Sequence, residues 1–89
     1  MDTTTPNRDL IRDMGLEDAI VFENPDYDSA IIGVSHDDRV VYSYARMIEH
    51  LVIQDGMDPE EAAEFIDYNT LGALPGIENG PIVVHIMFG

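Results

Sequence analysis

The sequence predicts an α+β domain in which a helical hairpin packs on one face of a four-stranded antiparallel sheet. Two segments between residues 43 and 71 have the apolar spacing of amphipathic helices. Four short segments rich in Ile, Val and Phe are typical of strands. At 89 residues the chain can bury one core but not two. We therefore expect a single domain over residues 1–89.

The two helices of the hairpin have clear boundary signals. Ser43 can cap the first helix, and Gly56 suits the left-handed residue that ends it. Asp58 can cap the second helix, with Pro59 at its first position. The second helix should end near Leu71. The residues expected to face the core are Ala45, Ile48, Leu51 and Val52 on the first helix and Ala62, Phe65, Ile66 and Asn69 on the second.

The strands and their directions follow from the turns between them. Strands are expected over residues 18–23, 30–35, 39–42 and 82–88. Turns join the first three strands as antiparallel neighbours. Two antiparallel helices would return the chain to the end at which the third strand stops. The fourth strand is therefore predicted to run antiparallel to the first and third.

The beginning of the chain carries no targeting signal. Residues 1–5 are expected to form a loose leader, followed by a short helix over residues 6–14 that Gly15 ends. The leader has neither the basic nor the apolar region of a signal peptide. The longest apolar runs are far shorter than the ~20 residues that span a bilayer. We therefore expect a cytoplasmic protein.

Charge is the most informative property of the composition. The chain has 18 acidic and four basic residues, all four of them arginine, and a net charge of −14. Such a chain should repel nucleic acid and anionic membranes, so we expect neither as a direct partner. A basic protein surface is the natural complement. Two other interpretations remain open, in which the acidity serves solubility or adaptation to a high-salt cytoplasm.

Several acidic clusters are candidates for binding that surface. Helix starts favour acids, which explains Asp58, Glu60 and Glu61 but not Glu64 and Asp67. Carboxylates spaced on a rigid frame can imitate a run of phosphates. The candidate partner-binding residues are Asp55, Asp58, Glu60, Glu61, Glu64, Asp67, Asp37, Asp38, Asp26 and Asp28.

No motif for catalysis or for metal binding is found. The chain has no cysteine, and its three histidines lack the spacing of a metal site. Ser35, His36 and Asp37 are adjacent and so cannot form a catalytic relay. The acidic turn at residues 23–28 lacks the glycine of a calcium loop. No phosphate-binding loop is present. We expect no enzyme, no cofactor and no metal site.

Two segments resemble a family of small acidic, mostly uncharacterised proteins of phages, mobile elements and gut bacteria. They are AIVFENPDYDSAIIGV at 19–34 and DGMDPEEAAEFIDYNT at 55–70, and the resemblance covers about residues 19–84. It implies no catalytic residue, and its setting favours host–phage conflict. In size and charge the chain is also similar to anti-CRISPR proteins that occupy the nucleic-acid channel of a Cas effector.

The expected function is therefore that of a non-enzymatic inhibitor. It would act as a DNA mimic on a basic surface of a host defence protein, such as a Cas effector subunit. The alternative is a small structural or regulatory domain that forms a homodimer through the free face of its sheet. This alternative rests on the apolar residues Ile31, Val41, Val83 and Met87, which give the sheet two apolar faces.

Overall fold

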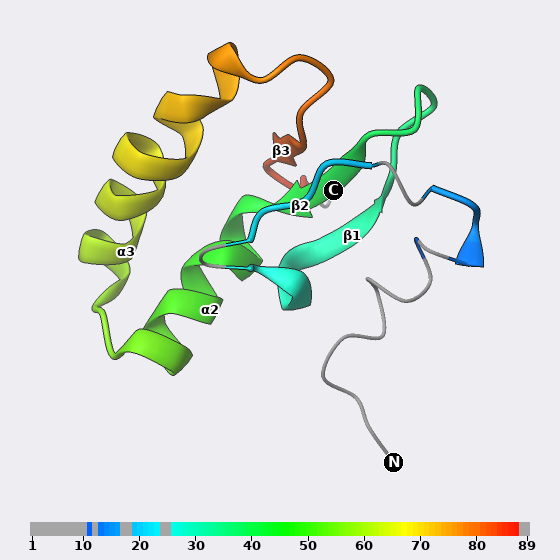
Figure 1. Ribbon diagram of the computed structural model, residues 1–89. Helices are drawn as coiled ribbons and strands as arrows, with labels where there is room; N and C mark the ends of the chain where they lie inside the picture. Colours follow the sequence, from blue (N-terminus) through cyan, green and yellow to red (C-terminus); the bar gives the residue numbers. More distant parts are fainter. Residues whose placement is uncertain (1–10, 12, 17–18, 24–25, 88–89) are drawn as a thin grey trace.

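A small sheet and two helices form the part of the chain that the computed structural model describes, which is residues 11, 13–16, 19–23 and 26–87 (Figure 1). The elements run in the order β1 (Ile31–Val34), β2 (Val40–Ser43), α2 (Tyr44–Asp55), α3 (Pro59–Phe65) and β3 (Ile82–Val84). This architecture agrees with the predicted α+β class. The predicted leader and most of the predicted helix over residues 6–14 lie outside the described residues.

The prediction of four strands is wrong, because residues 19–23 form no strand. The described sheet has three strands in the order β1-β2-β3. The backbone N–H of Phe22 donates instead to the hydroxyl of Tyr42, at 3.0 Å, and the two rings lie 4.7 Å apart. Phe22 thus contacts β2 through the side chain of Tyr42, and residues 19–23 add no strand to the sheet.

The prediction of a fully antiparallel sheet is also wrong. β1 and β2 are antiparallel, but β3 is parallel to β2, with Val41 beside Ile82 and Ser43 beside Val84. α2 starts directly at the end of β2, and α3 runs back beside it (Figure 1). A π-helical turn (Ile66–Thr70) and a 3-10 segment (Leu71–Gly76) then carry the chain to the other end of β2. The segment between β2 and β3 supplies the long crossover that parallel neighbours need.

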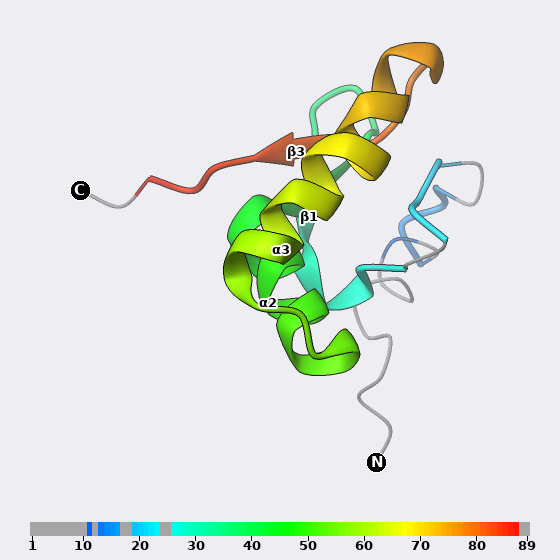
Figure 2. The ribbon, with the colours of Figure 1, turned by 90° about the vertical axis from the view of Figure 1, so that its left-hand side faces the viewer.

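The last strand is shorter than the predicted segment 82–88. β3 ends at Val84, and the described residues 85–87 form no regular structure. Figure 2 shows this part of the chain extending away from the sheet and the helices. Met87 is 88% exposed as a result.

The predicted start and end of the first helix and the predicted start of the second are confirmed, whereas α3 ends at Phe65 and not near Leu71, because the chain continues as a π-helical turn. The hydroxyl of Ser43 accepts from the N–H of Arg46 at 3.3 Å. The carboxylate of Asp58 accepts from the N–H of Glu61 at 2.8 Å. Gly56 ends α2 in the left-handed conformation, with φ of 70°. Ser43 thus marks the start of α2, and Gly56 and Asp58 mark the turn between α2 and α3.

The core lies between the helices, the sheet and the segment before β1. Its buried apolar residues are Ile11, Tyr27, Ala30, Ile31, Val40, Tyr42, Met47, Leu51, Ala62 and Ile66. Two expected core residues are exposed instead, namely Ala45 and Asn69. Met47 and Thr70 are buried beside the expected helix faces, and the hydroxyl of Thr70 lies 3.4 Å from that of Tyr27. No helix among the described residues has the length and apolarity that a membrane crossing requires.

Candidate acidic binding surface

The acids of the helical hairpin form a continuous exposed group along α3. Ala62 of α3 and Ile66, the first residue of the π-helical turn that follows it, are fully buried. The acids lie at the end of α2, in the turn between the helices, on α3 and in the π-helical turn, and all of them are exposed. We call this group the α3 acidic surface; it consists of Asp55, Asp58, Glu60, Glu61, Glu64 and Asp67.

The α3 acidic surface has no counter-ion within the part of the chain that the structure describes. None of its six carboxylates forms an ion pair with a residue that the structure describes. Asp67 accepts a hydrogen bond from the hydroxyl of Tyr44 at 2.9 Å. Burial and the neighbouring Asp67 carboxylate raise the pKa of Tyr44 above its usual value of 10.0. This phenol therefore stays neutral at physiological pH and leaves the charge of Asp67 in place.

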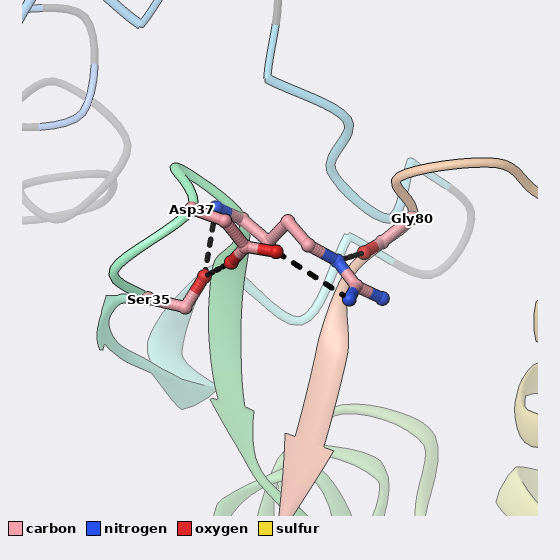
Figure 3. Close-up of polar contacts among 4 residues, drawn as sticks. Ser35, Asp37 and Gly80 are labelled. Carbon is pink, nitrogen blue, oxygen red and sulfur yellow. Dashed lines mark hydrogen bonds and ion pairs between the residues drawn. The ribbon is translucent and has the colours of Figure 1, made fainter.

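The acids of the hairpin loop between β1 and β2 have a different environment. The side chain of Arg39 lies 3.9 Å from the carboxylate of Asp37, and its Nε donates to the carbonyl of Gly80 at 2.8 Å (Figure 3). The hydroxyl of Ser35 donates to Asp37, and this bond does most to hold the pKa of that carboxyl below its usual range. Asp38 is exposed next to this network. The charge of Asp37 is thus partly compensated within the chain.

The turn before β1 brings one of its two candidate acids inside. Asp26 is exposed, and its carboxylate accepts from the N–H of Asp28 at 3.2 Å. Asp28 itself is only 6% exposed. Its burial follows from the preceding residue, because Tyr27 is fully buried and leads into a 3-10 turn (Asp28–Ala30). We therefore leave Asp28 out of the proposed contact surface.

An open depression lies at the C-terminal end of the α3 acidic surface. Its volume is about 640 Å³, and it is lined by Glu61, Glu64, Phe65, Asp67, Tyr68 and Asn69. Tyr68 is 85% exposed, which is unusual for a ring of this size. We call this feature the Tyr68 depression.

Sequence reasoning missed the aromatic part of this surface. Glu61, Glu64 and Tyr68 are three, four and seven residues apart, the spacing of one helix stripe. An aromatic residue on a stripe otherwise made of acids is a signal that the sequence does carry.

Two of the three histidines, His50 and His85, lie against aromatic rings. His50 lies 5.4 Å from the ring of Tyr27, and its Nδ1 is 3.4 Å from the hydroxyl of Ser29. His85 lies 4.7 Å from the ring of Tyr44. Within the described parts of the chain, no three His, Asp or Glu side chains lie close enough to hold a metal ion.

Comparison of the chain with protein-family models, with curated proteins and with solved structures gives no match in any of the three. The resemblance to small acidic phage and mobile-element proteins therefore stays a prediction from the residues quoted above.

Proposed function

We propose that this chain is a non-enzymatic inhibitor that covers a basic, nucleic-acid-binding surface of a defence protein. It acts as a DNA mimic in the manner of anti-CRISPR proteins, inside the cytoplasm of the host cell. The partner is a protein such as a Cas effector subunit, and its contact surface is the α3 acidic surface.

The proposal rests on the negative charge of the α3 acidic surface, which no cation among the described residues neutralises. Six exposed carboxylates lie between the end of α2 and the π-helical turn after α3, and none is paired with a described cation. Asp58 caps α3 and Asp67 accepts the Tyr44 hydroxyl, but like charges at helical spacing cost a few tenths of a kcal/mol per pair, so the clustering of the six acids is itself unfavourable for the fold. A complementary positive surface would relieve this repulsion and accelerate association.

The test is competition between this protein and DNA for purified Cas effectors, measured at several salt concentrations. We expect the protein to displace DNA and its affinity to fall steeply with added salt, because the contact is ionic. The variant E60Q/E61Q/E64Q/D67N should lose most of this competition.

The matched control is D13N/E23Q/E49Q/E78Q, which removes the same number of charges from exposed acids elsewhere. This control variant should keep most of its ability to displace DNA from the effector. Equal losses in the two variants would show that net charge alone is responsible. Affinity that does not change with salt would contradict the proposal.

The alternative function, a domain that dimerises through its sheet, has less support from the observed burial. Ile31 is only 4% exposed, and Val83 packs against the core. Val41 is half-buried, so Met87 is the most exposed of the four residues on which this alternative rests. Light scattering at high protein concentration decides between the two, since the inhibitor requires no second copy.

A further inference from the structure

We propose that the Tyr68 depression receives an arginine side chain of the partner, with the guanidinium stacked on the Tyr68 ring and paired with Glu61 and Glu64. This inference rests on the proposed function, because it assumes a basic partner, and it names the chemistry of the central contact.

The first argument is the position of the aromatic rings. Tyr68 is 85% exposed, and its hydroxyl has no partner among the described residues. Phe65 is half-buried next to it and lines the same depression. An exposed tyrosine in a concave site is a frequent anchor of protein interfaces, because it adds contact area at little entropic cost.

The second argument is charge complementarity. Glu61, Glu64 and Asp67 line the depression together with Phe65 and Tyr68. An apolar side chain in this place would bury carboxylates without partners, which is costly. A cationic side chain satisfies the carboxylates and the ring face together.

The third argument selects arginine over lysine. A guanidinium is planar, stacks on aromatic rings, loses its hydration readily and can pair with two carboxylates at once. The ammonium group of lysine is a compact, strongly hydrated charge that gains less from a ring. The combination of an exposed aromatic ring with two acids on the same helix stripe therefore favours arginine.

The experiment compares two synthetic peptides, one alternating arginine with glycine and one alternating lysine with glycine, of equal length and charge. Binding to the full chain is measured by calorimetry at physiological ionic strength, and NMR shifts locate the contact. We expect the arginine peptide to bind about two- to fivefold more tightly. The largest shifts should fall on residues 61–69.

Two pairs of variants test the roles of the ring and the acids. Tyr68→Ala should abolish the preference for arginine, whereas Tyr68→Phe should keep it, and Ile53→Ala removes an exposed apolar side chain elsewhere as a control. E61Q/E64Q should weaken the binding of both peptides more than the matched control E49Q/E78Q does. An unchanged arginine preference in Tyr68→Ala, or equal losses in the two double variants, would overturn the inference.

These outcomes are separate from the test of the proposed function. If the protein displaces DNA from an effector but Tyr68→Ala has no effect on the peptides, only the arginine contact is refuted. If the peptides behave as expected but no effector is blocked, the contact stands and the inhibitor function is refuted.

Discussion

Arg39 is predicted to hold β3 in its parallel position beside β2. Its Nε donates to the carbonyl of Gly80, two residues before β3, and Gly80 is buried. Arg39→Ala would leave this carbonyl without its partner, at a cost of about 1–3 kcal/mol. The ion pair with the 60% exposed side chain of Asp37 adds less than about 1 kcal/mol. We expect a total loss of about 2 kcal/mol, which lowers Tm by about 8–16 °C for a domain of this size.

Chemical denaturation measures the loss of stability, and hydrogen exchange shows where it acts. Amides of Ile82–Val84 should lose protection in Arg39→Ala, while those of α2 change less. Arg39→Lys keeps the charge beside Asp37 but lacks the guanidinium Nε–H, so it should lose almost as much. Asp37→Asn removes only the ion pair and should cost least. Full protection of β3 in Arg39→Ala would refute the reasoning.

Three further predictions concern the helical hairpin. Asp58→Ala removes the cap of α3 and should lower the free energy of unfolding by about 1 kcal/mol, whereas Asp58→Asn keeps a capping oxygen and should lose less; equal losses in denaturant titrations would contradict the capping role. Gly56→Ala should cost about 1 kcal/mol because φ is 70° there and no atom lies near an added Cβ, so the penalty is purely conformational; Gly56→Asn should cost less in the same titration. The pKa of Tyr44 is raised in the folded state, so its hydrogen bond to Asp67 is fully present below pH 10.0 and is lost as the pH rises through the higher folded value. Tyr44→Phe should remove this loss of stability at alkaline pH, and the absorbance of tyrosinate measures the ionisation.

Local signals made the helical hairpin predictable. The Ser43 cap, the left-handed Gly56 and the Asp58-Pro59 start each act within a few residues, and each is present in the structure. The exposure of the α3 acids follows from the same periodicity, because Ala62 and Ile66 take the inward positions. The hairpin and its charged face could therefore be derived from the sequence.

The arrangement of the sheet was harder to predict, because it depends on contacts between residues that are distant in the sequence. The apolar run at residues 20–22 has the composition of a strand but forms none, and the N–H of Phe22 donates to a side-chain hydroxyl of β2. Whether β3 runs parallel or antiparallel to β2 depends on the end of β2 at which the connection after α3 delivers the chain. The π-helical turn and the 3-10 segment lengthen this connection, and no short-range rule foresees them. The aromatic lining of the Tyr68 depression was missed because only the charged positions of the stripe were considered.

The parallel pairing of β2 with β3 also affects how this protein is made. β2 leaves the ribosome long before β3, so the backbone groups of Val41 that later face Ile82 are open during synthesis. Such an open edge can template the aggregation of newly made chains. The net charge of −14 makes two copies repel each other during this interval. The acidity that we assign to partner recognition would thus also protect the unfinished sheet until its last strand arrives.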